Sequence, residues 1–570
     1  ANHHVYQRIS HINSMTRILF CYPIIREEDN PKHAPFGMSI LAAVCEREGA
    51  QVAFYDMNAA RSVLSRNEVF KELVDVAQEG YDIVACGGLT TTYSCVKQVG
   101  KLLRPILPDA LFVMGGNLLT SLPNEIMTWL PEYDIGAVGD AWETIADILT
   151  RSHDRNWEGV KGVVWRKEHE LKINPIRPPI QNVDALPFPA WHLLPMEVYF
   201  RNSSILLSEA SWTAKKRCDV ATSFGCPLRC HFCLNESMIG ELGLAPSKWN
   251  KTDVDFSWKG HRVYHFHSTD YIIREIRDVE RKLWNVAPQG PIDYVAFLDE
   301  NWVTSSDVSG TNRIKEIADA WIDAGFQPLC VRDGMSHDPE KCHGKHVTAT
   351  SHAGRIREDL LRDMQRMGVS VLDYGLESFN MENMKEMAKG STPHLNIRAV
   401  RMTMSYGIRP CPNQILNFPT ESFMSIRDNM AAWKELGVVV YPFMCTPFPG
   451  THYFTAYRDR IQEQYGGDLE LFIMDLGDCT KPTATISDFT IEEITKIREW
   501  MVKDEREAID KYENIWRKRH DLTPLTPEQQ SEEWKNAELR AADPRGKWPP
   551  EQEPIPVQAS YKPEHVKIRG

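Results

Sequence analysis

Three features are missing from this 570-residue sequence, and each absence removes a class of protein. No apolar run reaches the roughly 20 residues that cross a bilayer, so we expect no transmembrane segment. Residues 1–14, ANHHVYQRISHINS, have no apolar core like that of a signal peptide, and we expect a leader or an artificial remnant there. No basic stripe accompanies the net charge of −13, so a nucleic acid is not an expected partner.

Cysteine is present but dispersed. The chain has 13 cysteines and no secretory signal, which argues against a disulfide framework. This usage is typical of the reducing cytoplasm, where most thiols are buried as small apolar side chains. We therefore expect a cytoplasmic protein. One group of cysteines is tightly clustered, within residues 226–233.

Residues 15–155 predict a first domain of alternating strands and helices. The runs RILFCYP, QVAFYD, YDIVACGG, ALFVMGG and YDIGAVGD are expected strands, with amphipathic helices between them. This alternation predicts an α/β fold with a Rossmann-like parallel sheet covered on both faces. Ligands bind such sheets beyond the carboxyl ends of the strands. The candidate binding residues at those ends are Thr90, Thr91, Gly115, Gly116, Asn117 and Gly139. For any one glycine pair, an ordinary tight turn is the alternative.

A proline-rich linker, residues 156–205, separates this domain from a second alternating series in residues 206–460. The expected strands are DVATS, DYVAFLDE, QPLCVRD, VSVLDYG, RPCPNQILNF and VVVYPFM. They predict a partial (β/α)6 parallel barrel with its chemistry at the carboxyl ends of the strands. Residues 461–570 read first as helices and then, from residue 522, as an extended polar tail.

A stretch rich in histidine and cysteine lies in what we expect to be an insertion after the third barrel strand. Histidine and cysteine are ligands for zinc or iron, so a metal site is one interpretation. The spacing fits no defined site, and strand-end insertions usually shape pockets, so we expect a pocket-lining or surface loop. The residues concerned are His337, Cys342, His343, His346 and His352.

The clustered cysteines are Cys226, Cys230 and Cys233, spaced C-x3-C-x2-C in GCPLRCHFC with no fourth cysteine close behind. A structural zinc site wants four protein ligands, and an ordinary four-iron cluster wants four thiolates. Three thiolates on such a cluster would leave one iron open to a small molecule. The alternative is a zinc site completed by Cys218 or His231.

The segment TSFGCPLRCHFC resembles the radical SAM (S-adenosylmethionine) superfamily, in the form found where a cobalamin-binding domain precedes the barrel. Further segments resemble motifs of that group in the same order: FLDENW, YGLESFNMENMKEMAKG, NFPTES and TPFPGT. PFGMSILAAVCEREGAQVAFYD is similar to the start of its cobalamin domain, and ALPFPAWHLLP to its joining segment. The group includes the class B methylases and the anaerobic magnesium-protoporphyrin monomethyl ester cyclases.

The resemblance implies a cofactor set and part of a site. The three cysteines would hold a [4Fe–4S] cluster, SAM would chelate the fourth iron, and Phe232 would lie against the adenine. Glu377 and Ser378 would contact SAM, and Arg332, at the expected end of the third strand, is a further candidate. A structural acid capping the next helix is the alternative for Glu377. An electron donor such as flavodoxin or ferredoxin is the implied partner.

The resemblance also implies bound cobalamin. Many cobalamin proteins supply a histidine to cobalt from a D-x-H-x-x-G motif, and residues 15–150 contain none. The resembled group commonly lacks it too, so we expect cobalt without a histidine ligand, which favours its reduced, nucleophilic state. His33, between the first expected strand and helix, is the alternative ligand.

The implied activity is methyl transfer. A 5′-deoxyadenosyl radical would take hydrogen from an unactivated carbon, and methylcobalamin would supply the methyl group. Asp299 and Glu300, after the second barrel strand, are candidate acids or bases facing the substrate, with a helix-start cap as the alternative. Oxidative cyclisation of the tetrapyrrole type is a second interpretation, and a non-catalytic cobalamin or zinc sensor is a third. Lipids, tetrapyrroles, peptides and other small molecules all stay open as substrates.

Overall fold

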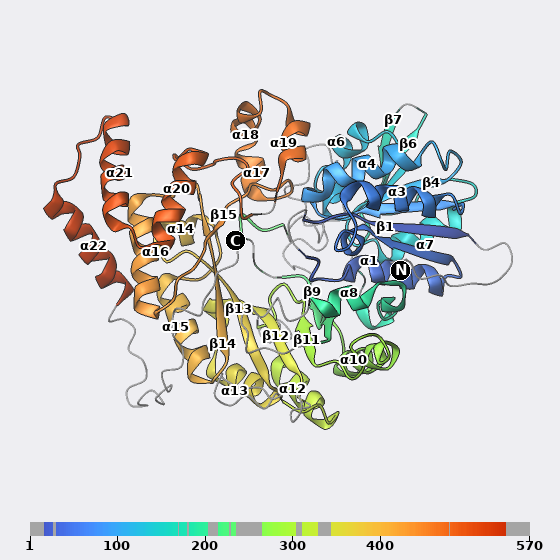
Figure 1. The fold of residues 1–570 in the computed structure, drawn as a ribbon, viewed down its shortest axis with the longest axis horizontal. Helices are drawn as coiled ribbons and strands as arrows, with labels where there is room; N and C mark the ends of the chain where they lie inside the picture. The colour runs from blue at the N-terminus through green and yellow to red at the C-terminus, as the bar shows by residue number, and fades with distance from the viewer. Residues whose placement is uncertain are drawn as a thin grey trace.

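The computed structural model describes residues 16–26, 30–168, 170–178, 180, 182–202, 215–226, 228, 230–234, 265–303, 311–328, 344–477 and 479–542. Figure 1 shows two sheet-containing domains with a set of helices from the C-terminal part of the chain beside them. Within the described residues, no helix is both long and apolar enough to span a membrane.

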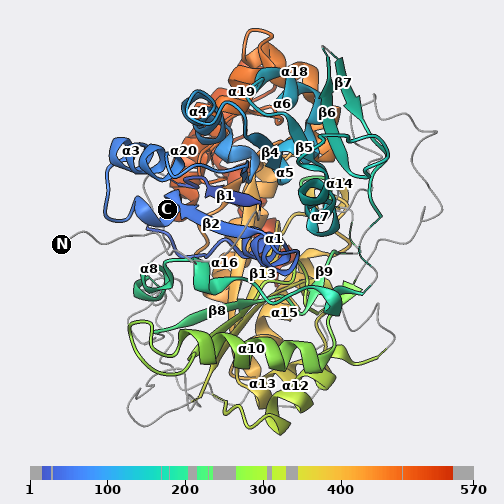
Figure 2. The ribbon, with the colours of Figure 1, turned by 90° about the vertical axis from the view of Figure 1, so that its right-hand side faces the viewer.

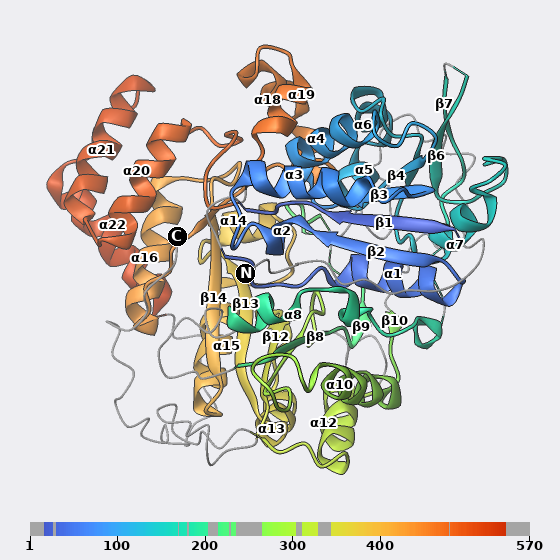
Figure 3. The same ribbon diagram turned by 45° about the vertical axis from the view of Figure 1, so that its right-hand side comes forward.

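The first domain is built on a seven-stranded sheet in the order β2-β1-β3-β4-β5-β6-β7. The first five strands are parallel, and almost all their residues are buried, as expected for a sheet covered on both faces. Helices α1 and α7 lie below the sheet in Figure 3, with α3 and α4 above it. The strands are β1 (Arg17–Tyr22), β2 (Gln51–Asp56), β3 (Ile83–Gly87), β4 (Leu111–Gly115) and β5 (Ile135–Ala137). The helices are α1 (Phe36–Arg47), α2 (Met57–Ala60), α3 (Arg66–Ala77), η1 (Thr90–Thr92), α4 (Tyr93–Leu103), α5 (Asn117–Ser121), α6 (Pro123–Trp129) and α7 (Trp142–Arg151).

Two further strands, β6 (Val163–Lys167) and β7 (Glu170–Ile173), extend this sheet with antiparallel pairing. They fall inside the range predicted as linker, so the sheet continues farther along the chain than the sequence indicated. Short helices follow: η2 (Val183–Ala185), η3 (Trp191–Leu193) and α8 (Met196–Arg201). Trp191, 2% exposed, packs in the main core and anchors this connection to both domains.

The second domain is a curled six-stranded sheet in the order β15-β14-β13-β12-β11-β8, with every pair parallel. It is the predicted partial barrel. Figure 2 shows its strands below the first domain, with α10, α12 and α13 at its base. Its strands are β8 (Arg217–Val220), β11 (Tyr294–Phe297), β12 (His346–Ser351), β13 (Val369–Glu377), β14 (Arg409–Leu416) and β15 (Phe443–Met444). Its helices are α10 (Thr269–Leu283), α12 (Arg313–Asp323), η6 (Ala353–Arg355), α13 (Glu358–Met367), α14 (Met381–Glu386), α15 (Pro393–Ser405) and α16 (Phe423–Leu436). A small antiparallel pair, β9 (Ser223–Phe224) and β10 (His265–Phe266), lies beside β8.

The third barrel strand corrects the sequence analysis. Strand β12 lies between β11 and β13 and is formed by HVTATS, residues that we placed in an insertion. The prediction that QPLCVRD forms this strand is therefore wrong: only residues 327–328 of that run are described, and Pro328 forms an isolated bridge with Lys345. The apolar run QPLCVRD was misleading. HVTATS, farther along the chain, contains β-branched valine and threonine, which favour a strand equally well.

The C-terminal helices connect the two domains. They are α17 (His452–Ala456), α18 (Arg458–Gln464), α19 (Leu469–Asp475), α20 (Ile491–Val502), α21 (Arg506–Arg519) and α22 (Pro527–Ala541). Glu470 of α19 accepts a 2.6 Å hydrogen bond from the Tyr93 hydroxyl of α4, and Arg458 of α18 lies 3.2 Å from Glu125 of α6. Helix α22 lies against α16 and falls in the range predicted as an extended tail, so that part of the prediction is wrong.

Candidate active site

The cysteine loop leaves the carboxyl end of β8 and is held there by Asp299, which follows β11. Asp299 is 1% exposed and accepts hydrogen bonds from Thr222 N (2.9 Å), from Thr222 Oγ1 (2.6 Å) and from the Ser223 hydroxyl. Burial raises the pKa of Asp299, and these bonds oppose the shift. Both carboxylate oxygens are thus used within the protein, and Asp299 caps the start of the cysteine loop rather than a helix.

The three clustered thiols share one electrostatic environment. Cys230 is buried, whereas Cys226 and Cys233 are half-buried, and the Cys233 amide donates to Cys230 O at 3.0 Å. Burial raises the pKa of Cys230 to about 12; the nearby ammonium of Lys389 opposes this, and the other two thiols add to it. Asn301 Nδ2 lies 4.0 Å from Cys226 Sγ as a donor to sulfur.

The structure does not gather a fourth ligand for zinc. Cys218 is buried on β8, where its electrostatic neighbours are Glu275, Asp219, Lys345 and Arg217 rather than the triplet. The His231 ring stacks on that of His452, with centroids 4.1 Å apart. Within the described ranges, no three His, Cys, Asp or Glu side chains form a group that could hold a metal ion.

A buried ion pair lies beside the thiols. Lys389 Nζ donates to Glu377 Oε1 at 2.6 Å, and both side chains are at most 9% exposed. Glu377 follows a bulge in β13 and has φ of +61°, a left-handed conformation that is strained for glutamate. A Cβ at Gly375 would lie 2.3 Å from Glu377 Oε1 and 2.7 Å from Lys389 Nζ, so any larger residue there would displace the ends of both side chains. Glu377 is therefore not a helix cap.

Phe232 connects this ion pair with the NFPTES segment. Lys389 Nζ lies 5.6 Å from the centroid of the Phe232 ring, and the Phe418 ring lies 6.3 Å from it in an edge-on arrangement. Glu421 of the same segment is buried and accepts from Asn417 N at 3.0 Å, which orders the turn that carries Phe418. Three segments that each resemble a family motif only weakly by themselves thus lie together: their residues Phe232, Lys389 and Phe418 are neighbours at the cysteine loop.

Ser378 differs from the expectation of a ligand contact. Its side chain is fully buried, and its hydroxyl accepts from Asn380 N at 3.1 Å and donates to Asn429 Oδ1 at 3.3 Å. These bonds hold the turn that follows Glu377. Arg332 lies outside the described residues.

Glu300 sits at the mouth of the barrel, toward the first domain. Its Oε2 accepts from Gly225 N at 3.1 Å, and the side chain is open to solvent. Surrounding protein nevertheless desolvates it and raises its pKa to about 7, with further contributions from Asp299 and from Asp140 of the first domain. Desolvation likewise raises the pKa of Asp140 to about 7. Glu300 and Asp140 therefore lie close enough for the charge of Asp140 to contribute to the raised pKa of Glu300.

The predicted binding residues of the first domain lie at the carboxyl ends of the strands of its sheet. Thr90 Oγ1 donates to Asn117 Oδ1 at 2.9 Å, which joins the loops after β3 and β4. Gly116 has φ of +84°, and a Cβ there would lie 2.6 Å from Gly88 O. Gly139, with φ of +77°, has nothing within 4 Å of a Cβ position and leaves its surroundings open. Thr91 and Gly115 lie on the same loops.

The predicted histidine-rich insertion divides into two parts. His337, Cys342 and His343 lie outside the described residues. His346 is buried in β12, and His352, just after that strand, is 3% exposed with its Nε2 3.0 Å from Lys389 O. Burial lowers the pKa of His352 to about 3. This histidine supports the backbone that carries the buried lysine.

His33 is solvent-accessible on the loop between β1 and α1. Desolvation, with the nearby guanidinium of Arg217, lowers the pKa of His33 to about 4, so its imidazole is neutral at pH 7. Asp219 of β8 opposes the shift.

Two family models match the chain. The B12 binding domain matches residues 23–149, and the Radical SAM superfamily matches residues 220–431. The chain belongs to the cobalamin-dependent radical SAM enzymes. The predicted fold class and cofactor set are confirmed, as is the prediction of a cobalamin-dependent radical SAM enzyme.

Several proteins are similar to this cobalamin-dependent radical SAM enzyme in sequence. An uncharacterized methyltransferase of Pyrococcus horikoshii is 24% identical over 470 residues, which are 81% of this chain and 85% of that protein. The anaerobic magnesium-protoporphyrin IX monomethyl ester cyclase of Cereibacter sphaeroides is 20% identical over 78% of this chain and 64% of the relative. Cytidylyl-2-hydroxyethylphosphonate methyltransferase of Streptomyces wedmorensis is 25% identical over 36% of this chain and 45% of its own length.

Solved structures share the fold. The radical SAM methyltransferase TsrM of Kitasatospora setae, with cobalamin and a [4Fe–4S] cluster bound, matches with a TM-score of 0.57, 15% identity and 79% coverage of each chain. The cobalamin-dependent enzyme OxsB matches with a TM-score of 0.54 and 12% identity, over 93% of this chain and 72% of OxsB.

The residues of this enzyme fit its cofactors. The three cysteines of one loop suit a cluster with an open iron, and the buried lysine beside them offsets negative charge. Desolvation lowers the pKa of Lys389, but Glu377 and the thiols outweigh it and raise that pKa, so the ammonium persists. The open surroundings of Gly139 suit a cofactor at the sheet edge.

Sequence reasoning quoted the lysine of the K-G motif without assigning it a role, missed Asn301, and considered His352 only as part of the histidine-rich stretch. The signal for Lys389 was available, since a lysine that precedes a glycine in such a motif is a candidate buried charge. Asn301 lies in the FLDENW segment beside the two acids that we considered. No signal in the sequence connects His352 with Lys389, because 37 residues separate them.

Proposed function

We propose that this enzyme adds a methyl group to an unactivated carbon of a small molecule held between the first domain and the barrel mouth. The observation that supports the proposal is the proximity of two carboxyls, one from each domain. Glu300 is hydrogen-bonded to Gly225 of the cysteine loop, and the charge of Asp140, next to Gly139, contributes to the raised pKa of Glu300. A substrate between these two carboxyls would face both cofactors.

Each cofactor would be held by residues that the sequence predicted. We propose that Cys226, Cys230 and Cys233 hold the [4Fe–4S] cluster and that Glu377 and Phe232 bind SAM. The loops after β3, β4 and β5, with Thr90, Thr91, Gly115, Gly116, Asn117 and Gly139, would hold cobalamin. When bound, the cluster and SAM supply a carbon-centred radical, and cobalamin supplies the methyl group.

The protein's own groups prepare the site. Lys389 would orient the Glu377 carboxylate, because its ammonium is fixed by a 2.6 Å contact in a buried setting. Asp299 would hold the cysteine loop in position, and Ser378 would order the turn behind Glu377. We assign proton transfer or substrate binding to Glu300, because a carboxyl with a pKa of about 7 exchanges protons readily near neutral pH. Arg332 remains a proposed SAM contact from the sequence alone.

The test is metal content and methyl transfer in enzyme purified anaerobically with cobalamin supplied. We expect about four irons and one cobalt per chain, with the iron lost and the cobalt kept when the three cysteines are changed to alanine. Methyl-labelled SAM should transfer its label to the product. Zinc in place of iron would refute the assignment, and iron without cobalt would remove cobalamin from the mechanism.

Oxidative cyclisation is a second candidate, favoured by the similarity to magnesium-protoporphyrin cyclases. It predicts product formation without labelled methyl, so the same experiment separates the two reactions. A non-catalytic sensor would need no SAM pocket, and loss of SAM binding in Glu377→Ala with the cluster intact would count against it.

The partner and compartment follow from the chemistry. We propose a one-electron donor such as a flavodoxin or ferredoxin, since the cluster must be reduced from outside the chain. We propose the cytoplasm as the compartment, because dispersed free thiols suit a reducing environment.

A further inference from the structure

Three consecutive residues of α16 link the C-terminal helices to the turn behind Glu377. They are Arg427, Asp428 and Asn429, which are 2%, 6% and 0% exposed. A charged side chain buried between helices needs an opposite charge or a hydrogen-bond partner, since an unpaired buried charge costs several kcal/mol. Each of the three residues has such partners, and together they reach from α21 and α22 to residues 378–380.

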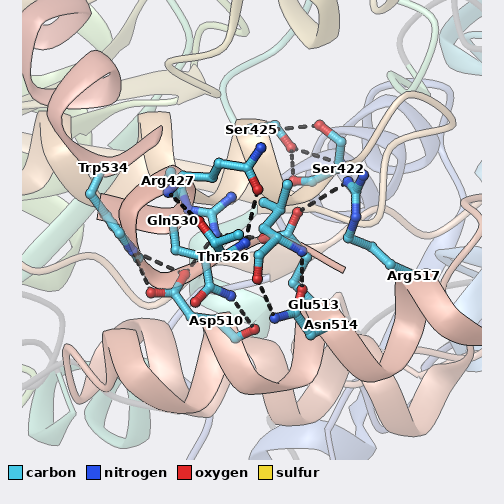
Figure 4. Close-up of polar contacts among 12 residues, drawn as sticks. Ser422, Ser425, Arg427, Asp510, Glu513, Asn514, Arg517, Thr526, Gln530 and Trp534 are labelled. Atoms are coloured by element: carbon cyan, nitrogen blue, oxygen red, sulfur yellow. Dashed lines mark hydrogen bonds and ion pairs between the residues drawn. The ribbon is translucent and has the colours of Figure 1, made fainter. Parts of the chain in front are cut away.

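Arg427 fixes the C-terminal helices on the barrel. Its Nη2 lies 2.6 Å from Asp510 Oδ1 and 2.5 Å from Glu513 Oε2, both on α21. Trp534 of α22 donates from Nε1 to Asp510 Oδ2 at 3.0 Å, and its ring centroid lies 5.4 Å from the guanidinium. Figure 4 shows Arg427 enclosed by these side chains. Helices α21 and α22 are therefore built around a buried cation of the barrel.

Asp428 extends this connection toward the active site. Arg540, in the last turn of α22, donates to Asp428 Oδ1 from Nε at 2.8 Å and from Nη2 at 2.6 Å. Asp428 Oδ2 accepts from Asn380 Nδ2 at 2.8 Å. One buried carboxylate thus joins α22 to the third residue after Glu377. Desolvation raises the pKa of Asp428, and the bonds from Asn380 and Arg540 oppose this shift.

Asn429 and Asn380 fix the backbone of the same turn. Asn429 Oδ1 accepts from Phe379 N at 2.7 Å, and Asn380 Oδ1 accepts from the amides of Glu382 and Asn383 at 3.0 and 3.1 Å. The latter bonds cap α14, the helix that leads to Lys389. A left-handed conformation such as that of Glu377 persists only where surrounding contacts determine it. The bonds from α16 to residues 378–380 are among those contacts, together with the bonds from Asn396 of α15 to the carbonyls of Leu376 and Ser378.

We infer that helix α22 is part of the SAM site, with Arg540 as a positioning residue that acts through Asp428 and Asn380 on the Glu377 turn. This inference rests on the proposed role of Glu377 in SAM binding. Arg540 does not touch the cofactor; it holds the carboxylate that holds the turn. The C-terminal helices therefore contribute to cofactor affinity as well as to the contact between domains.

The chain offers a matched control on the same two helices. Lys434 of α16 lies 2.9 Å from Glu538 of α22, an exposed pair that has no connection to the turn. Arg540→Gln and Lys434→Gln each remove one charge from the α16–α22 contact, and only the first reaches Asp428. Arg540 is itself 46% exposed at its side chain, so glutamine there is compatible with folding.

The experiment measures equilibrium SAM binding to anaerobic holoenzyme loaded with cluster and cobalamin. We expect Arg540→Gln to weaken SAM binding about fivefold, a coupling at the low end of the usual range. The KM for SAM should rise with little change in kcat, and Arg540→Lys should recover part of the affinity. Lys434→Gln should bind SAM like the wild type, and all variants should keep their iron and cobalt.

Two outcomes overturn the inference, and one overturns its basis. Wild-type SAM affinity in Arg540→Gln, with affinity lost in Glu377→Gln, would sink the inference alone. Equal weakening in Arg540→Gln and Lys434→Gln would show that helix contact in general, not the Asp428 connection, controls affinity. Wild-type SAM affinity in Glu377→Gln would refute the proposed function of Glu377 itself.

Discussion

Removing the ammonium of Lys389 is the sharpest perturbation that the structure offers. The substitution Lys389→Met keeps the length of the side chain but leaves the Glu377 carboxylate, 7% exposed, without the partner 2.6 Å away. Breaking a buried ion pair from one side destabilises a protein by about 3–5 kcal/mol, because the remaining charge stays desolvated. At a slope of about 3 kcal/mol per molar urea, the midpoint of barrel unfolding should fall by about 1–1.7 M.

The assay compares urea midpoints rather than absolute free energies, because a chain of two domains need not unfold in one two-state step. Lys385→Met is the control: Lys385 is exposed one turn earlier, and its loss should change stability by no more than about 0.5 kcal/mol. The double variant Lys389→Met/Glu377→Gln removes both charges and should regain much of the midpoint while still failing to bind SAM. A midpoint within about 0.3 M of wild type in Lys389→Met would refute the reasoning, as would a double variant no more stable than the single one.

Three further predictions follow from the same geometry. Gly375→Ala places a Cβ 2.3 Å from Glu377 Oε1 and should weaken SAM binding about tenfold in equilibrium titration, with iron content unchanged. The carboxyls of Glu300 and Asp140 have folded pKa values raised to about 7, above their values in the unfolded chain. The thermal midpoint should therefore fall as the pH rises from about 4 to 7, and Glu300→Gln should flatten that dependence. Glu470→Gln removes the ion pair between Glu470 of α19 and Lys97 of α4, worth about 1 kcal/mol, and should speed limited proteolysis between the domains.

Local chemistry made much of this protein predictable. The alternation of buried apolar runs with amphipathic segments identified both parallel sheets, because strands covered on two faces must be apolar throughout. The spacing of Cys226, Cys230 and Cys233 identified the cluster loop, because three adjacent thiols have few other uses. Candidate cofactor residues followed from their places at strand ends, where parallel sheets bind ligands.

Errors arose where local pattern and long-range pairing disagree. QPLCVRD has the apolar pattern of a strand, yet HVTATS forms β12, because it pairs with β11 and β13 on both sides. The hairpin of β6 and β7 was read as linker, since only its antiparallel pairing to β5 makes it part of the sheet. Helix α22 was predicted to be tail because its sequence is polar and begins with proline. Its stability as a helix comes from contact with α16, which the local sequence does not show.

The sequence by itself determined the two-domain order, the cofactor set and the three thiols, since each depends on residues close together along the chain. Only the tertiary structure decided which of two adjacent acids is available: both carboxylate oxygens of Asp299 accept hydrogen bonds from Thr222 and Ser223, while Glu300 is exposed and has a raised pKa. It also decided that Lys389, 12 residues from Glu377, is its partner. Such pairings depend on how β13 and α14 pack, and packing energy is not a property of any short segment.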